Sequence, residues 1–193
     1  MQETLKENAS LVRKKKAIFF VGMMASGKST VGRELARKIG WDFFDIDSVI
    51  VKEKGMSITE IFEREGEAAF RFYETQTMAQ YTQRERVVLA MGGGAPMFEV
   101  NRTLLARGFV VQLAVGVSDV LERTKNDTTR PLLQCEDPTA RVRSMLIDRA
   151  PVYDAVSDMK IHVSRKTPQQ IAALVLEDKR VQEMLSALEK EGE

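Results

Sequence analysis

The chain has 193 residues, of which 44% are hydrophobic and 30% are charged, with a formal net charge of +1. These values are ordinary for one globular domain, and they exclude proteins that need a strongly basic surface to bind nucleic acid or an anionic membrane. The single cysteine, Cys135, cannot form an internal disulfide, which suits a reducing compartment. The sequence has no apolar run long enough to span a bilayer and no recognisable signal peptide, so we expect a cytoplasmic protein.

A glycine-rich segment near the N-terminus is the strongest functional signal. Residues 22–29, with the sequence GMMASGKS, fit the phosphate-binding pattern G-x-x-x-x-G-K-[ST]. Apolar residues 17–21 predict a buried strand before this loop, and an amphipathic pattern after it predicts a helix that ends at Gly40. In this context the backbone N–H groups and the helix N-terminus bind phosphate. We expect Lys28 to reach the β- and γ-phosphates and Ser29 to bind Mg²⁺.

The rest of the chain alternates between predicted strands and predicted helices. Further strands are expected at residues 41–47, 87–90, 109–115 and 159–163. Ser118 is expected to cap a helix that reaches Lys125. Another helix is expected to begin after Asp137 and to run to about Arg149, where Pro151 interrupts it. Five apolar strands alternating with helices predict a three-layer α/β/α fold, with a parallel sheet covered on both faces.

We divide the chain into three parts. Residues 1–16 are expected to form an N-terminal tail, residues 17–178 a single P-loop domain, and residues 179–193 a charged helical tail. Within the domain, residues 124–136 are polar and prone to turns, and they lack a clear period. This segment is therefore predicted to be a mobile lid.

Two aspartates, Asp45 and Asp47, lie where the second predicted strand ends. Residues at the carboxyl ends of parallel strands line the ligand crevice in such sheets. In phosphoryl transfer the acceptor hydroxyl must be oriented and relieved of its proton, and Asp47 is our candidate for this role. Asp45 is a candidate to hold Mg²⁺ through water, with capping of the following helix as the alternative.

Glycines and arginines supply a second set of candidates. Gly92-Gly93-Gly94 follows the third strand, where bare backbone suits an anionic or hydroxylated ligand, although such a triplet can also be a plain loop. Arg71, Arg130 and Arg149 lie in apolar or proline-bearing surroundings, and a guanidinium can grip a carboxylate or a phosphate with two parallel bonds. Each arginine alone fits a solvated position equally well. Glu74 shares a helix face with Arg71.

Over residues 18–168 the chain resembles the shikimate kinase family. The resemblance rests on Gly22 to Thr30, Asp45-Ile46-Asp47, Phe70-Arg71-x-x-Glu74, Gly92-Gly93-Gly94, Arg130-Pro131-Leu132-Leu133 and Arg149-x-Pro151-x-Tyr153, in the family's order. It implies a P-loop fold like that of nucleoside monophosphate kinases, with strand order 2-3-1-4-5 and a mobile lid. It also implies ATP-dependent phosphorylation of the 3-hydroxyl of shikimate, in the route to chorismate and the aromatic amino acids.

The resemblance also implies roles for individual residues. The ATP-binding residues would be Gly22, Ala25, Ser26, Gly27, Lys28, Ser29, Thr30, Arg123, Arg130 and Lys166. The shikimate-binding residues would be Asp47, Arg71, Glu74, Gly92, Gly93, Gly94 and Arg149. Ser29 and Asp45 would bind Mg²⁺. Lys28, Asp47 and Arg130 would be catalytic, the last reaching the phosphates when the lid closes. The expected partners are shikimate and ATP, on a monomeric chain.

Two other functions stay open at this point. A kinase of the same fold that acts on gluconate or a nucleoside monophosphate would keep the P-loop. It would not keep the combination of Asp47, Arg71, the glycine triplet and Arg149. A nucleotide-dependent switch would need a guanine-specificity motif of the Asn-Lys-x-Asp type, and the nearest segment, Lys125-Asn126-Asp127, has the wrong order.

Overall fold

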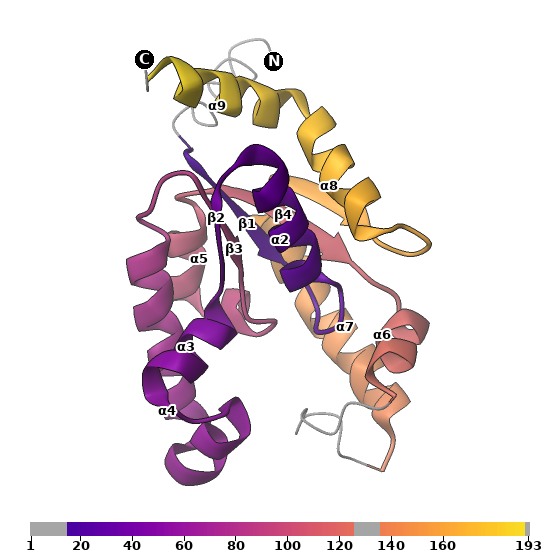
Figure 1. Cartoon of the computed structure of the whole chain (residues 1–193). Coiled ribbons are helices and arrows are strands. Elements are labelled where there is room, and N and C mark those ends of the chain that lie inside the picture. The colour runs from indigo at the N-terminus through magenta and orange to yellow at the C-terminus, as the bar shows by residue number, and fades with distance from the viewer. Residues whose placement is uncertain (1–14, 126–135, 192–193) are drawn as a thin grey trace.

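The computed structural model describes residues 15–125 and 136–191 (Figure 1). The predicted lid falls almost entirely outside these ranges, together with Arg130 and Cys135, as does most of the predicted N-terminal tail. None of the described helices is long and apolar enough to cross a membrane.

A five-stranded parallel sheet forms the centre of the described chain. Its strands are β1 (Ala17–Val21), β2 (Asp42–Asp45), β3 (Val87–Ala90), β4 (Phe109–Ala114) and β5 (Met159–His162), in the order β2-β3-β1-β4-β5. Each neighbouring pair is parallel. β1 and β3 are buried along their whole length, as their continuous apolar sequences require for central strands covered on both faces. The predicted fold class and strand order are confirmed.

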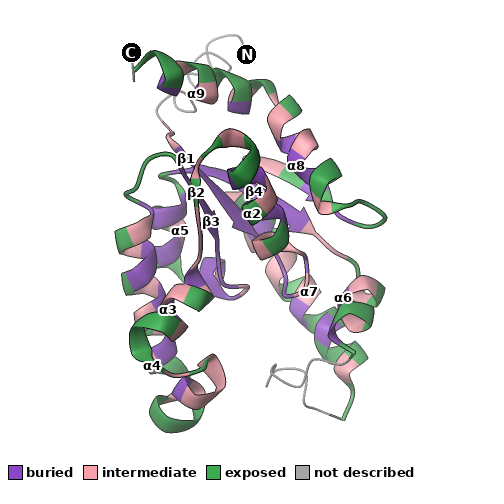
Figure 2. Cartoon of the chain, viewed as in Figure 1, coloured by how far each residue is buried: buried purple, intermediate pink, exposed green. Residues whose placement is uncertain are grey.

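Helices cover both faces of the sheet (Figure 1). They are α2 (Lys28–Ile39), α3 (Ile46–Lys54), α4 (Ile58–Tyr81), α5 (Glu99–Leu105), α6 (Val117–Thr124), α7 (Pro138–Val156), α8 (Pro168–Glu177) and α9 (Lys179–Lys190), with a 3₁₀ helix η1 (Ala95–Met97). The sheet divides the core into two layers. Phe20 packs with α2, α8 and α9, whereas its neighbour Phe19 packs with α3, α4 and α5, because successive strand residues point to opposite faces. Figure 2 shows the buried strands between these layers.

The second strand is shorter than the sequence predicts. β2 ends at Asp45, and Asp47 lies in the first turn of α3 rather than in the strand. The reason is that Asp45 caps α3: its Oδ1 accepts a hydrogen bond from the Ser48 N–H at 3.1 Å. α4 is kinked at Gly66, whose φ of 85° lies outside the helical region.

Two predicted helix ends are wrong. α6 begins at Val117 with Gly116 as its N-cap, so Ser118 lies inside the first turn instead of capping it. α7 does not stop near Arg149 but continues through Pro151 to Val156. The proline removes one backbone hydrogen-bond donor, but the turn that follows it carries Tyr153, which is buried in the core. Tertiary packing outweighs the local preference here.

Helix α9 packs against the domain rather than standing apart from it. The segment after residue 178 is helical as expected, and Val181, Met184 and Leu188 lie in the same buried cluster as α2 and α8. The charged residues that dominate its sequence occupy the other faces of the helix. The predicted C-terminal segment is therefore part of the layer that covers the sheet.

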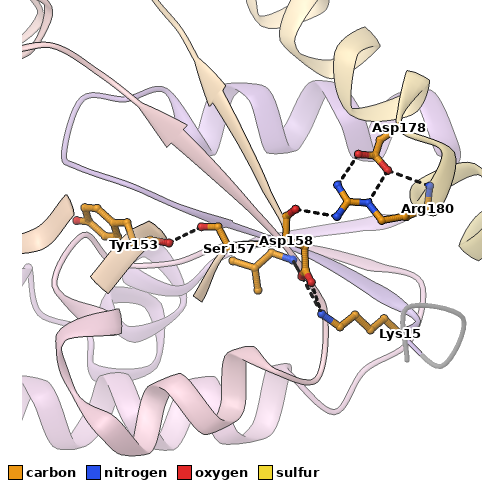
Figure 3. Close-up of polar contacts among 7 residues, drawn as sticks. Lys15, Tyr153, Ser157, Asp158, Asp178 and Arg180 are labelled. Atoms are coloured by element: carbon orange, nitrogen blue, oxygen red, sulfur yellow. Dashed lines mark hydrogen bonds and ion pairs between the residues drawn. The ribbon is translucent and has the colours of Figure 1, made fainter. Parts of the chain in front are cut away.

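Lys15, the first described residue, and Arg180 at the start of α9 both contact Asp158, between α7 and β5 (Figure 3). The Asp158 carboxylate accepts hydrogen bonds from Lys15 Nζ at 2.7 and 2.8 Å and from the Val110 N–H at 2.7 Å. Arg180 at the start of α9 donates to the Asp158 carbonyl at 2.9 Å. These contacts join the end of α7 to β4, to α9 and to the residues that precede β1.

Candidate active site

A cavity of about 980 Å³ lies at the carboxyl ends of the strands, where ligands bind in open parallel sheets. Most predicted site residues line it: Ala25, Ser26, Gly27, Lys28, Ser29, Thr30, Asp45, Asp47, Arg71, Glu74, Gly92, Gly93, Gly94, Arg123, Arg149 and Lys166. Gly22 belongs to the same loop but is not among the lining residues, and Arg130 lies outside the described residues. The structure thus brings the predicted ATP-binding residues and the predicted shikimate-binding residues together in one cavity.

The loop between β1 and α2 has the backbone that its glycines allow. Gly22 has a φ of 140°, and a Cβ at this position would lie 2.5 Å from the Leu113 carbonyl oxygen. Gly27 has a φ of 92° and precedes α2 as its N-cap. Lys28 Nζ donates to the carbonyl oxygens of Gly22 and Met23, at 2.9 and 3.0 Å. The lysine and the N-terminus of α2 therefore lie together at the cavity. Both carry positive charge or partial positive charge, which favours phosphate binding there.

The predicted metal pair lies together beside this loop. The Ser29 hydroxyl donates to Asp45 Oδ2, while Asp45 Oδ1 caps α3. Asp45 therefore caps α3 with one oxygen and reaches the P-loop with the other. Its role as a helix cap leaves room for the predicted role as a Mg²⁺ ligand. A hydroxyl and a carboxylate in contact are oxygen donors of the kind that Mg²⁺ prefers.

The opposite side of the cavity carries an ion pair on α4. Arg71 donates to Glu74 Oε2 at 2.9 Å and to Glu67 Oε1 at 3.0 Å. Glu74 is fully buried, so its charge depends on this partner. Glu67 was missed by sequence reasoning, although its position one turn before Arg71 could have indicated it.

The glycine triplet packs directly against charged side chains. A Cβ at Gly92 would lie 2.2 Å from Glu74 Oε1 and 2.9 Å from Asp47 Oδ1, and one at Gly94 would lie 2.8 Å from the Arg71 guanidinium nitrogens. Any larger residue would displace these groups. The glycines are therefore needed for the close approach of backbone to the acidic and cationic side chains.

The Gly93 carbonyl oxygen connects the triplet to α7. It accepts a hydrogen bond from Arg149 at 3.3 Å and one from the Tyr153 hydroxyl at 2.5 Å. The family resemblance includes Tyr153 in the Arg149-x-Pro151-x-Tyr153 motif but implies no role for it. Its spacing of four residues from Arg149 places the two side chains on one helix face, and this was the available signal.

Two cations lie near the P-loop on the side of α6 and α8. Arg123 donates to the Ala25 carbonyl at 2.9 Å, and Lys166 donates to the His162 carbonyl at 3.0 Å. Pro168 and Ile171 line the same part of the cavity and add an apolar surface. A cationic and apolar border of this kind suits the base end of a nucleotide.

Burial raises the pKa of Glu74 to about 7. The Arg71 guanidinium opposes this rise through its charge and its hydrogen bond, the negative charge of Asp47 adds to it, and Arg149 opposes it. Glu74 thus changes its charge near neutral pH, within hydrogen-bond distance of the Arg71 guanidinium.

We expect the Glu74→Gln substitution to remove a pH dependence of stability. The carboxyl group titrates near 4.5 when unfolded and near 7 when folded, so the folded state binds more protons between these values. The free energy of unfolding of the wild type therefore falls as pH rises through this window, by up to about 3 kcal/mol. Urea unfolding at pH 5 and pH 8 measures the change. An equal change in the wild type and the variant would contradict the raised pKa.

Comparison with known proteins identifies the family. The shikimate kinase family model matches residues 24–180. A shikimate kinase of Halorhodospira halophila is 47% identical over 83% of this chain and 91% of its own length, and one of Methylococcus capsulatus is 44% identical over 83% and 92%. The structure of the Acinetobacter baumannii shikimate kinase in complex with shikimate superposes with a TM-score of 0.82 at 40% identity, covering 87% of this chain and 94% of that one. The chain belongs to the shikimate kinase family.

Proposed function

We propose that this protein transfers the γ-phosphoryl group of ATP to the 3-hydroxyl of shikimate, giving shikimate 3-phosphate and ADP in the route to chorismate. The observation that carries the proposal is the composition of one cavity. It joins a P-loop with Lys28 to an acidic group, Asp47, and to two arginines, Arg71 and Arg149. An acceptor with both hydroxyls and a carboxylate matches the part of the cavity that carries Asp47 and the two arginines.

The P-loop half holds ATP. The backbone N–H groups of the loop and the N-terminus of α2 bind the phosphates, and Lys28 exchanges its carbonyl partners for phosphate oxygens. Arg123 and Lys166 border the adenine. Arg130 lies outside the described residues, and its proposed part is to add a positive charge beside the phosphates. Its part rests on the family resemblance.

Ser29 and Asp45 would hold Mg²⁺ beside the phosphates. Their side chains already touch, and both offer oxygen. The described residues contain no group of three or more His, Cys, Asp or Glu side chains that could hold a metal ion by themselves. This agrees with a magnesium ion that keeps several waters and binds phosphate oxygens. When bound, the ion would neutralise charge on the β- and γ-phosphates.

The other half binds and orients the acceptor. Arg71 and Arg149 clamp the carboxylate of shikimate, and Glu74 fixes Arg71 through their 2.9 Å hydrogen bond. Asp47 accepts a hydrogen bond from the reacting hydroxyl and takes up its proton as the bond to phosphorus forms. One chain supplies both halves of the cavity, which supports the proposal of a monomer.

A ligand screen tests the proposed acceptor. Thermal unfolding is followed with a non-hydrolysable ATP analogue and either shikimate, gluconate or a nucleoside monophosphate. Shikimate should raise the melting temperature beyond the effect of the ATP analogue alone, since only the folded state binds it. Stabilisation by gluconate and not by shikimate would overturn the proposal.

We expect Arg149→Ala to raise the KM for shikimate about 10- to 100-fold, because a charge-assisted grip on the carboxylate is lost. The KM for ATP should stay unchanged. Steady-state kinetics with each substrate varied in turn measures both values. Arg143→Ala, an exposed arginine on the same helix, is the matched control and should behave as the wild type. An unchanged shikimate KM in Arg149→Ala would remove this residue from the acceptor site.

A further inference from the structure

We propose that Tyr153 is a positioning residue, which holds Arg149 ready for the acceptor carboxylate through the carbonyl oxygen of Gly93. The inference rests on the proposed function of Arg149. The Tyr153 side chain is buried, and its hydroxyl donates a 2.5 Å hydrogen bond to Gly93 O. Arg149 donates to the same oxygen at 3.3 Å. The two side chains therefore share one acceptor.

The two hydrogen bonds to the Gly93 carbonyl differ in length, and this difference leaves the Arg149 guanidinium available for a ligand. The short bond from the tyrosine satisfies the Gly93 carbonyl, and the arginine makes only a long bond to it. The guanidinium has five N–H donors in a fixed plane, and most of them remain for an anion in the cavity that Arg149 lines. Without the hydroxyl, the side-chain hydrogen bond from Arg149 would have to satisfy the carbonyl, and a shorter bond would be favoured. The arginine would then be drawn onto the backbone and away from the ligand.

Burial raises the pKa of Tyr153. The phenol, which is protonated at neutral pH even with its ordinary pKa, therefore stays a donor toward the carbonyl oxygen, in agreement with the geometry. A charged phenolate would have no proton to give and would repel the carbonyl oxygen.

The backbone that carries Tyr153 is fixed to the rest of the domain. The Ser157 hydroxyl donates to the Tyr153 carbonyl at 2.5 Å, and the next residue, Asp158, is bonded to Val110 of β4 and to Lys15 (Figure 3). The last turn of α7 thus has little freedom to move relative to the sheet. A tyrosine on this turn, one turn after Arg149, can set the position of Gly93 relative to the arginine.

Tyr153→Phe tests the inference, since it removes the hydroxyl and keeps the buried ring. We expect the KM for shikimate to rise about tenfold, the effect of one well-made hydrogen bond, with the KM for ATP unchanged and the melting temperature close to that of the wild type. Tyr73→Phe is the matched control. It removes a hydroxyl that donates an exposed hydrogen bond to Glu65 at 2.6 Å, and it should leave both KM values unchanged.

A double-mutant cycle shows whether Tyr153 acts through Arg149. In the Arg149→Ala background, Tyr153→Phe should change the shikimate KM by less than about twofold. The same increase in both backgrounds, or a loss of stability with an unchanged KM, would overturn the positioning role. The wild-type control separates the two proposals. If the wild type phosphorylates shikimate and Tyr153→Phe has the same shikimate KM, only this inference is overturned. If the wild type is inactive on shikimate, the proposed function is overturned as well.

Discussion

Asp47→Asn should lower kcat with shikimate by about 10²- to 10⁴-fold, the range of a positioned general base. Asp47 lines the cavity from the first turn of α3, and one of its oxygens lies 2.9 Å from the place where a Cβ of Gly92 would be. An asparagine has nearly the same shape and can still contact the acceptor. It cannot take up the proton that the hydroxyl must lose.

The effect should be confined to the chemical step. A coupled assay of ADP release with shikimate measures kcat, and binding of a fluorescent ATP analogue shows that the P-loop half is intact. Asp42→Asn at the exposed start of β2 is the matched control, and its activity should equal that of the wild type. Full activity of Asp47→Asn would remove Asp47 from its proposed role.

Lys28→Met should lower kcat/KM for ATP by about 10³-fold, as expected for the loss of a cation aimed at charge that develops in the transition state. Lys28 Nζ lies at the base of the loop, where it donates to the carbonyls of Gly22 and Met23 until phosphate oxygens replace them. Methionine keeps most of the side-chain length and should leave the fold intact.

The same coupled assay measures this loss, and Lys38→Met, on the exposed face of the same helix, provides the control. The control should retain wild-type kinetics. If Lys28→Met did so too, the phosphates would have to be neutralised elsewhere in the site, and the assignment of the P-loop lysine would be wrong.

The fold was largely predictable from the sequence because its central strands are continuous apolar runs. β1 and β3 stand out in this way, and helical patterns fill the intervals between strands. Periodicity does not give the strand order, which came from the family resemblance. The P-loop was predictable because few residue types can form it: Gly22 and Gly27 both need positive φ values.

Other features depend on contacts between distant parts of the chain. The sequence places Glu74 on the helix face of Arg71, but its complete burial follows from how α4 packs against the glycine triplet. The continuation of α7 through Pro151 reflects tertiary packing that overrides a local signal. The bond from Tyr153 to Gly93 joins residues 60 positions apart, and the local spacing indicates only that Tyr153 shares a helix face with Arg149.

ADP release from ATP and Mg²⁺, measured with shikimate or with gluconate as the acceptor, is the most direct test of the proposed acceptor. We predict release that depends on shikimate, that is at least 100-fold slower with gluconate, and that is accompanied by one equivalent of shikimate 3-phosphate. Release driven by gluconate, with none driven by shikimate, would contradict the assignment of the acceptor site.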